Sequence, residues 1–443
     1  MKKDTMAIYK LLLKYMILPI GNVFYGGHYL NFLTQWDDYD AMSEDELEHI
    51  QKKNLDSILS HAAKTVPYYK SLSYSSLADF PILTKDILRS HKNDLVSSDF
   101  DITSLDKHHS SGSTGIQSFT YMTQEHTFYL RALQTHWWRW SGYNFGDYLL
   151  QFGISQKRPL LKKLKDFFYR CYYNKAFGIS ETTLRHILKN ISKKKGIYIA
   201  GYPSVINQLA MVENNLKLTP NVSGIICFGD KLFNHYTTNI KQAFGDSVTI
   251  IDTYGCAEGL LMACKYDLEH YYIMSPHVVL EVVDDNGTPV KDGEMGHVLV
   301  TCLTNKAMPL IRYKLGDLAI KLPKEHYPKN RKLNYPLLQK VVGRETDIIK
   351  TTKNITLNIH SFTGVLEYYQ EIKQYKVIQN SLESITIQYI ADSNFNEACL
   401  DEIKTKLNTL TQQCLNIYFE KVPYIAPTKS GKPQIIESNL NKS

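Results

Sequence analysis

The chain has 443 residues, with 51 lysines and arginines against 44 aspartates and glutamates, so its formal net charge is +7. Hydrophobic residues make up 43 % and charged residues 21 %, which excludes disordered, collagen-like and low-complexity proteins. The charge is too small to indicate nucleic-acid binding. Seven cysteines without a framework of close pairs indicate free thiols and a reducing compartment, so we expect a cytoplasmic protein.

The first apolar segment covers residues 8–25, where Lys10, Lys14 and Pro19 interrupt the apolar side chains. It falls short of the roughly 18 apolar residues that a membrane-spanning helix needs. A secretory signal is disfavoured, because Lys14 splits the apolar region and no small-residue cleavage site follows. Two alternatives stay open: a helix packed on the domain, and an amphipathic helix lying on the inner face of a membrane.

The next signal is a helix that begins after Ser43, since Glu46 completes a capping box and Pro67 ends the apolar pattern. From about residue 100 to 340, apolar runs such as 225–228 and 248–251 indicate buried strands, and the segment 232–244 between them indicates a helix. This alternation predicts an α/β sheet with covering helices. After residue 277, three strand-like runs (278–283, 298–303 and 318–322) predict an antiparallel subdomain.

The last hundred residues predict a small α+β domain. The expected order is strand 348–357, helix 362–371, strand 385–390, helix 396–410 and strand 417–422. We place the boundary at Gly343 and Arg344, giving a large domain of residues 1–343 and a small domain of residues 344–443. The fold class expected is therefore α/β, with a large first domain of mixed α/β sheets and an antiparallel subdomain.

Two segments of the large domain combine residues that suit a phosphorylated ligand. In the first, glycines permit close backbone approach while amides and hydroxyls can donate to phosphate oxygens: Ser110, Ser111, Gly112, Ser113, Thr114 and Gly115. The second, residues 252–258, leaves the end of a buried strand and ends at Glu258, which could hold a hard cation such as Mg²⁺. A surface loop and a plain strand-to-turn junction are the structural alternatives.

Three further segments carry single candidate groups. Asp317 follows a turn glycine and could accept hydrogen bonds from a ribose diol. Arg344 stands at the domain boundary and could contact phosphate or ribose. Lys432, on a glycine-containing segment near the C-terminus, could place a positive charge on an anion. The alternatives are an ordinary turn, a charged linker and a basic tail.

Taken together and in this order, the five segments resemble the motifs of the adenylate-forming superfamily, which includes the acyl-CoA synthetases. The resemblance covers residues from about 40 to the end. It implies that the domain of residues 1–343 binds ATP and the carboxylate and that residues 344–443 form a mobile lid domain. It implies that residues 110–115 bind phosphate, that Glu258 binds magnesium and that Lys432 is catalytic. It also assigns to ATP the residues Gly229, Asp230, Thr253, Tyr254, Gly255, Asp317 and Arg344.

The branch that the sequence resembles is that of the phenylacetate–CoA ligases, and within it the members associated with capsular polysaccharide biosynthesis. This resemblance rests on residues 66–69, 228–230 and 307–313. It implies ATP-dependent activation of a carboxylate to an acyl-adenylate, with release of pyrophosphate and transfer to CoA or to an amine or hydroxyl of a sugar precursor. A non-catalytic nucleotide-binding protein on the same fold is the alternative.

The sequence departs from the branch at Asp230, where a glutamate is usual, and at three places that concern the acceptor. No lysine follows the phosphate loop, Thr346 replaces an aspartate of the hinge, and residues 351–354 contain no glycine where the pantetheine arm of CoA would pass. These departures favour an acceptor other than CoA.

Two smaller groups have competing interpretations. Some members of the branch hold a structural zinc near Cys264, His270 and Cys302, but zinc needs four ligands, and buried thiols are the favoured interpretation. The aromatic residues in 136–140 could line an acyl pocket, but they are more typical of a core helix. The lysines of 157–165 and 193–195 indicate a solvated face or contact with anionic lipid or a CoA phosphate.

Overall fold

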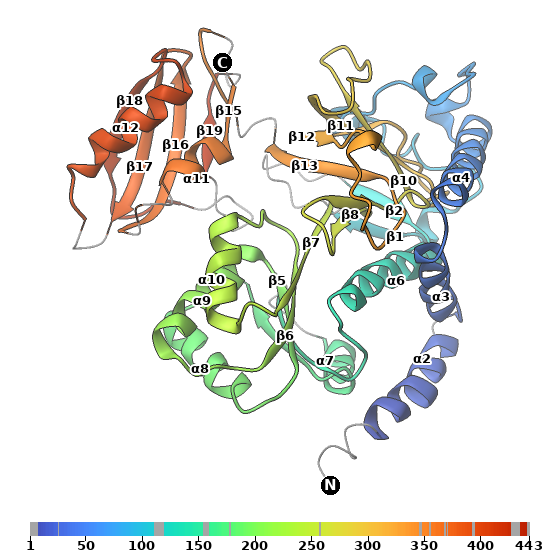
Figure 1. Ribbon diagram of the computed structural model, residues 1–443. Helices are drawn as coiled ribbons and strands as arrows, with labels where there is room; N and C mark the ends of the chain where they lie inside the picture. Colours follow the sequence, from blue (N-terminus) through green and yellow to red (C-terminus); the bar gives the residue numbers. More distant parts are fainter. Residues whose placement is uncertain are drawn as a thin grey trace.

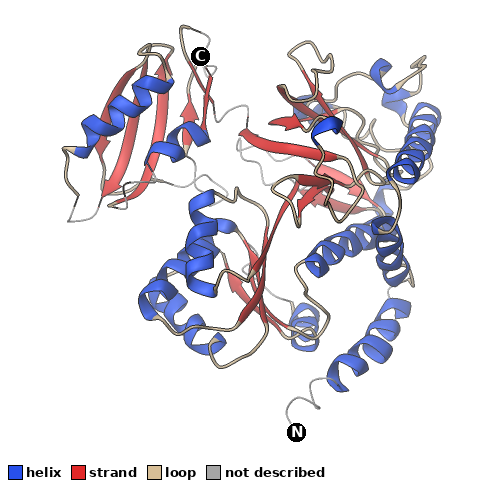
Figure 2. Cartoon of the chain, in the orientation of Figure 1, coloured by secondary structure: helices blue, strands red, loops and turns tan. Residues whose placement is uncertain are grey.

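The computed structural model describes residues 8–24, 26–109, 119–153, 159–176, 179–256, 258–344, 348–353, 356–366, 369, 371–391, 395–426 and 435–440. Within these residues the chain forms an eleven-stranded sheet with helices on both faces and a separate four-stranded sheet near the C-terminus (Figures 1 and 2). The predicted fold class is confirmed.

One half of the large sheet is parallel, in the order β7-β6-β5-β3-β4. Three of the connecting helices, α8, α9 and α10, pack their apolar sides on one face of this half and form a core with Ile199 and Ile225. The strands are β3 (Tyr148–Gly153), β4 (Cys171–Lys175), β5 (Ile197–Gly201), β6 (Val222–Cys227) and β7 (Thr249–Cys256). The helices are α7 (Leu160–Phe168), α8 (Glu181–Ile191), α9 (Pro203–Leu216) and α10 (Asn234–Phe244).

The other half is antiparallel and continues from β7 in the order β8-β9-β13-β12-β11-β10. Its strands are β8 (Leu260–Lys265), β9 (Tyr271–Ile273), β10 (Val278–Val283), β11 (Met295–Cys302), β12 (Tyr313–Lys321) and β13 (Leu337–Arg344). Strand β7 is therefore parallel to one neighbour and antiparallel to the other. The end of such a strand is a place where an open sheet leaves room for a ligand.

Helices α3, α4 and α6 contribute to a core on the second face, around the buried side chains of Trp36 and Trp137, and η1 and α2 precede them in the chain. The predicted capping box is present, since Ser43 Oγ accepts from the Glu46 amide and Glu46 Oε2 accepts from the Ser43 amide. These elements are η1 (Leu13–Ile17), α2 (Leu18–Phe24), α3 (Tyr29–Asp40), α4 (Glu44–Thr65) and α6 (Gln124–Trp140). The aromatic residues of α6 pack in this core, as the favoured interpretation expected.

Shorter elements complete the large unit. They are η2 (Pro67–Tyr69), η3 (Leu77–Asp79), α5 (Lys85–Ser90), η4 (Ile102–Ser104), β1 (Asp106–His109), β2 (Phe119–Met122) and η5 (Lys324–His326). Strands β1 and β2 form a two-stranded antiparallel sheet in which His109 pairs with Phe119.

The C-terminal sheet has the order β18-β17-β16-β19, and α11 and α12 contribute to its core. The elements are β14 (Ile348–Lys350), β15 (Thr356–Asn358), α11 (Ile359–Leu366), β16 (Ile372–Ser381), β17 (Ser384–Ala391), α12 (Cys399–Leu410), β18 (Asn416–Lys421) and β19 (Ile436–Ser438). Two details differ from expectation. The strand predicted over 348–357 is the pair β14 and β15, and the helix predicted to residue 371 ends at Leu366, before β16. The domain boundary at Gly343 and Arg344 stays a prediction.

Candidate active site

The segment predicted to bind phosphate, Ser110 to Gly115, lies outside the described residues, but the strands on either side of it are positioned. On the return strand β2, the buried Thr120 Oγ1 donates a hydrogen bond to the backbone carbonyl of Glu258 at 3.2 Å. The base of the β1–β2 hairpin is therefore fixed beside the turn that carries the predicted magnesium ligand.

Glu258 lies in the turn between β7 and β8, and its side chain is buried. Tyr313, the first residue of β12, donates from Oη to Glu258 Oε1 at 3.1 Å. Burial and the neighbouring carboxylate raise the pKa of Tyr313 far above its usual value, so the hydroxyl stays protonated and acts as a donor. The turn needs Gly259, which has φ +87°, and a Cβ there would lie 2.6 Å from the Met122 methyl.

The chemistry of Glu258 suits magnesium rather than a metal held by protein ligands alone. Magnesium is commonly bound by one or two carboxylates together with substrate phosphates and water. Among the described residues there is no group of three or more His, Cys, Asp or Glu side chains that could hold a metal ion.

A second contact joins two predicted ATP-binding residues from distant strands. Tyr254 Oη, on β7, donates to Asp317 Oδ2, on β12, at 2.9 Å, although three strands of the sheet order separate β7 from β12. Asp317 is also the register partner of Arg344 across β12 and β13. The candidate ribose ligand, the Tyr-Gly motif and the backbone of the hinge arginine are thereby brought together.

The predicted residues Gly229 and Asp230 follow the end of β6. Gly229 has φ +87°, and a Cβ there would lie 2.3 Å from a ring carbon of Tyr202, so only glycine fits. Asp230 Oδ2 accepts from Ser204 Oγ at 2.5 Å. Beside it, Lys231 Nζ donates to the Val342 carbonyl at 2.6 Å, so this turn is tied to the strand that leads into the hinge.

The other residues of the Tyr-Gly segment have structural contacts. Thr253 Oγ1 donates to the Cys227 carbonyl at 2.9 Å and links β7 to the end of β6. Gly255 allows the hairpin to close, because a Cβ there would lie 2.8 Å from the Leu260 carbonyl oxygen.

Sequence reasoning missed three contributors to this region. Thr120 and Tyr313 were not assigned roles, although Tyr313 lies within a recognised motif. The third is Asp252, which is buried and accepts from Tyr271 Oη at 2.5 Å. Burial raises the pKa of Asp252 to about 6, and the Tyr271 hydrogen bond opposes that shift. Their partners lie far away along the chain, so no local pattern identifies them.

The catalytic role of Lys432 stays a prediction, because this residue lies outside the described residues. The suggested zinc ligands are not grouped among the described residues: Cys264 Sγ lies 3.3 Å from the Lys265 carbonyl oxygen, and the half-buried His270 has Nδ1 3.5 Å from the Gln339 carbonyl oxygen. Cys302 is buried, and all seven cysteines are free thiols.

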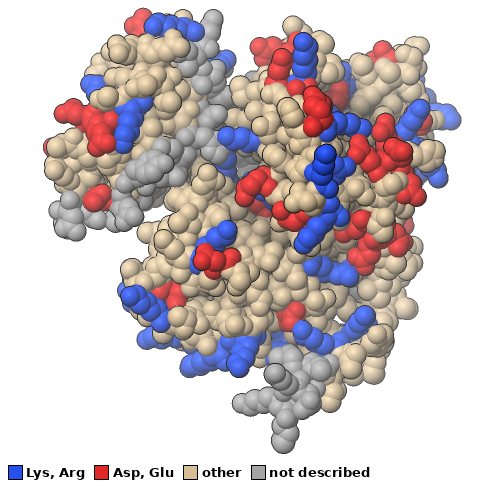
Figure 3. Space-filling view, viewed as in Figure 1, with Lys and Arg blue, Asp and Glu red and all other residues tan. Residues whose placement is uncertain are grey.

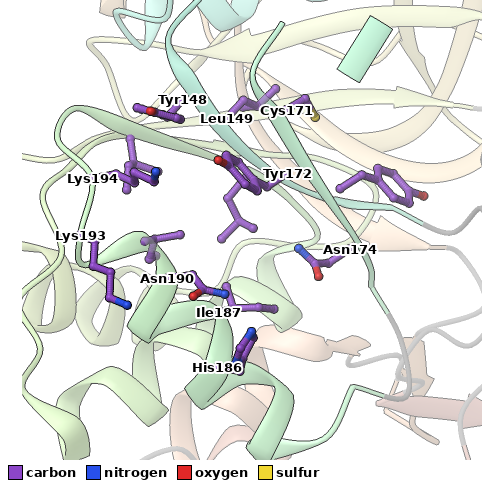
Figure 4. Close-up of a pocket in the computed structure, with 14 residues that line it drawn as sticks. Tyr148, Leu149, Cys171, Tyr172, Asn174, His186, Ile187, Asn190, Lys193 and Lys194 are labelled. Atoms are coloured by element: carbon purple, nitrogen blue, oxygen red, sulfur yellow. The ribbon is translucent and has the colours of Figure 1, made fainter. Parts of the chain in front are cut away.

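A cavity of about 650 Å³ lies elsewhere, between β3, β4 and α8 (Figure 4). Its lining includes Tyr148, Tyr172, His186, Lys193 and Lys194, and none of its lining residues is a candidate ATP-binding residue. It does not belong to the site around Glu258.

Comparison with known proteins places these features in context. Residues 348–439 match the CapK C-terminal domain family. Protein CapK of Staphylococcus aureus is 22 % identical over 426 residues, which are 89 % of this chain and 90 % of that protein. Phenylacetate-coenzyme A ligase of Escherichia coli K12 is 34 % identical over 107 residues, 23 % of each chain. Indoleacetate–lysine synthetase of Pseudomonas savastanoi is 33 % identical over 125 residues, 27 % of this chain and 29 % of that protein.

The fold is shared with a solved ligase. The structure of 2-hydroxyisobutyryl-CoA ligase in the postadenylation state with its acyl-AMP has a TM-score of 0.73 and 15 % identity, covering 91 % of this chain and 92 % of that chain. The present chain therefore has the fold of an adenylate-forming CoA ligase.

Proposed function

We propose that this chain, which resembles CapK and the phenylacetate–CoA ligases in sequence and an adenylate-forming CoA ligase in fold, activates a carboxylate with ATP. The carboxylate oxygen attacks the α-phosphorus, a new oxygen–phosphorus bond forms, and the bond to pyrophosphate breaks. The products are an acyl-adenylate and pyrophosphate.

The observation that carries this proposal is the convergence on Glu258. Three chain segments meet there: the turn after β7, the return strand of the predicted phosphate loop through Thr120, and β12 through Tyr313. A buried carboxylate held by a neutral donor is a preorganised group, which costs little reorganisation during the reaction.

The barrier to adenylation is chiefly electrostatic, because two anions must meet. Magnesium bound at Glu258 would supply positive charge to the phosphate oxygens. Asp317 would hold the ribose, with Tyr254 fixing the orientation of its carboxylate through the 2.9 Å hydrogen bond. We assign Lys432 as the catalytic lysine, and we expect the C-terminal domain to rotate about the hinge between the two half-reactions.

The acceptor of the acyl group is CoA or an amine or hydroxyl, and we favour the amine or hydroxyl of a surface-polysaccharide precursor. The names of the relatives include both kinds of acceptor. One is a coenzyme A ligase, and another is a synthetase named for lysine, which carries amines. Similarity to a protein named CapK supports a capsular role. Residues 351–354 contain no glycine, and Lys353 Nζ donates to the Gln412 carbonyl at 3.1 Å. Side chains there should narrow the path of a pantetheine arm.

Release of pyrophosphate tests the activity. The full chain is incubated with ATP, Mg²⁺ and a panel of carboxylates that includes aryl acetates and hydroxy acids. Glu258→Gln should lower kcat by about 10²–10³-fold, whereas Glu269→Gln, at a side chain that is 97 % exposed, should not. If ATP binds but no carboxylate gives pyrophosphate, the protein is a non-catalytic nucleotide-binding protein; an unchanged Glu258→Gln would refute the role of this residue.

A second assay identifies the acceptor. Once a carboxylate is found, CoA or an amino sugar is added and the products are followed by mass spectrometry. Efficient thioester formation at low CoA would overturn our preference, and adenylate that persists with CoA and is consumed by the amino sugar would support it. We propose a cytoplasmic location for the reaction, with contact to the membrane through the N-terminal helix.

A further inference from the structure

Two helices far apart in the sequence expose apolar side chains to solvent. In the N-terminal helix, defined as residues 8–24, the side chains exposed by between 43 % and 76 % are Ile8, Leu11, Leu12, Tyr15, Met16, Ile20 and Val23. In α7, Leu160, Leu164 and Phe167 are 82 %, 52 % and 74 % exposed. Their spacing of four and three residues places the α7 side chains on one face of the helix. Soluble proteins rarely expose apolar side chains in such continuous groups.

The two helices are joined to each other. Tyr9 Oη, on the N-terminal helix, donates to the carbonyl of Phe168 at the end of α7 at 2.6 Å. Lys10 forms an ion pair with Asp147 at the start of β3. Leu13 and Leu18 of the same helix are buried, so the helix rests on the domain while the side chains named above stay exposed. The two exposed groups therefore belong to one surface at one end of the molecule.

This surface is bordered by positive charge. The N-terminal helix contains Lys10 and Lys14 and no acidic residue, while α7 contains three lysines and one aspartate. Three more lysines follow α8, at 193–195. The Lys194 ammonium lies 5.1 Å and the Arg170 guanidinium 3.5 Å from the centroid of the Tyr148 ring. In Figure 3, lysine and arginine side chains gather along the lower edge of the molecule.

We propose that the N-terminal helix and α7 together form a docking surface for an anionic lipid bilayer. An apolar helix face bordered by lysines is the pattern of helices that lie in the membrane interface, where apolar side chains enter the acyl boundary and ammonium groups contact lipid phosphates. No described helix is long and apolar enough to cross a membrane, so the contact is peripheral. A second copy of this chain fits less well, because pairing the two surfaces would bring lysines against lysines.

The proposal does not depend on the ligase activity, and binding to vesicles tests it directly. Full-length protein is sedimented with vesicles of phosphatidylcholine alone and with vesicles in which about one third of the lipid is phosphatidylglycerol. We expect clear binding only to the anionic vesicles, weakening as salt is raised. The double variant Lys162→Gln/Lys163→Gln should lose about thirtyfold in affinity, which corresponds to ~1 kcal/mol for each lysine.

A second pair of variants tests the apolar face. Leu164→Gln/Phe167→Gln should lose at least about tenfold in affinity, and because both side chains are exposed, the melting temperature should not change. The matched controls, Leu410→Gln and Lys329→Gln/Lys404→Gln, alter exposed residues elsewhere and should bind as the wild type does.

Three results would overturn the proposal. The first is equal binding to neutral and anionic vesicles, or to neither. The second is wild-type binding by both helix variants. The third is a protein that is dimeric without lipid and becomes monomeric in Leu164→Gln/Phe167→Gln, which would assign the surface to a second copy.

Discussion

Arg312 provides a sharp test of the structure, because it lies in the same segment as the predicted ribose ligand Asp317 while its own contacts indicate a structural role. Its side chain is buried, and Nε lies 3.2 Å from Oε1 of Glu281. Its two terminal nitrogens donate to the carbonyls of Ala78, Phe80 and Gly287 at 2.9–3.3 Å. The residue has φ +49°, a conformation that persists only where its surroundings enforce it.

Replacing Arg312 with methionine should leave Glu281 buried without its cation. Removal of one partner of a buried ion pair costs about 3–5 kcal/mol. With about 2.1 cal/mol/K of unfolding entropy per residue, and the first 343 residues unfolding together, a loss of about 4 kcal/mol lowers the melting temperature by about 6 °C.

The loss should depend on pH with a defined sign. Burial already raises the pKa of Glu281, while Arg312 opposes the shift. Without Arg312 the folded state binds this proton more tightly than the unfolded chain, so the variant is penalised more at pH 8 than at pH 5. Calorimetry at both values measures this difference. Arg312→Met/Glu281→Met should recover much of the loss, because a buried ion pair can often be replaced by apolar side chains.

The contrary outcome is equally clear. If Arg312→Met melts as the wild type does but binds ATP more weakly, the side chain acts at the nucleotide and the structural assignment is wrong. If the double variant is less stable than the single one, the cost does not come from the unpaired carboxylate.

Three further predictions concern the site. Lys432→Ala should lower kcat for adenylation about 10²–10³-fold, because about 2.7–4 kcal/mol of transition-state stabilisation is lost. The affinity for ATP should change little, and unchanged pyrophosphate release would refute the assignment. Asp317→Ala should weaken ATP binding by about 1.5–3 kcal/mol, as measured by titration calorimetry, with Asp292→Ala as a control. Since burial raises the pKa of Asp252 to about 6, the free energy of unfolding should fall by about 3 kcal/mol as pH rises from about 4 to 6, and Asp252→Asn should lack this slope.

The local patterns of the sequence predicted much of the fold, because the same residues that form the signal also form the element. The capping box of Ser43 and Glu46 needs only four consecutive residues, and it is present. Element ends were less predictable. The pattern from Phe362 predicts a helix to residue 371, whereas the described Tyr369 and Glu371 are not helical and β16 begins at Ile372, since an amphipathic strand and a helix can share a short apolar pattern.

The candidate site could be predicted only as separate segments. Each motif has a local signature, but the contacts between motifs depend on the curvature and order of the strands. Nothing near Tyr254 in the sequence indicates that its hydroxyl meets Asp317, 63 residues later, or that Tyr313 rather than Arg312 faces Glu258. Arg312, the residue immediately before Tyr313, forms an ion pair with Glu281 instead.

The C-terminal unit is not connected to the large unit by the hinge segment alone. Phe233, which immediately precedes α10, is buried among the apolar side chains of the C-terminal core, including Ile349 and Leu357. Two residues earlier in the same turn, Lys231 donates to the carbonyl of Val342. This turn begins with Gly229 and Asp230, which are predicted to bind ATP. If the C-terminal domain rotates between half-reactions, Phe233 must leave its pocket, and burying a phenylalanine side chain is worth about 1.5–3 kcal/mol. A nucleotide bound at this turn would thus act on the same residues that hold the C-terminal unit in place.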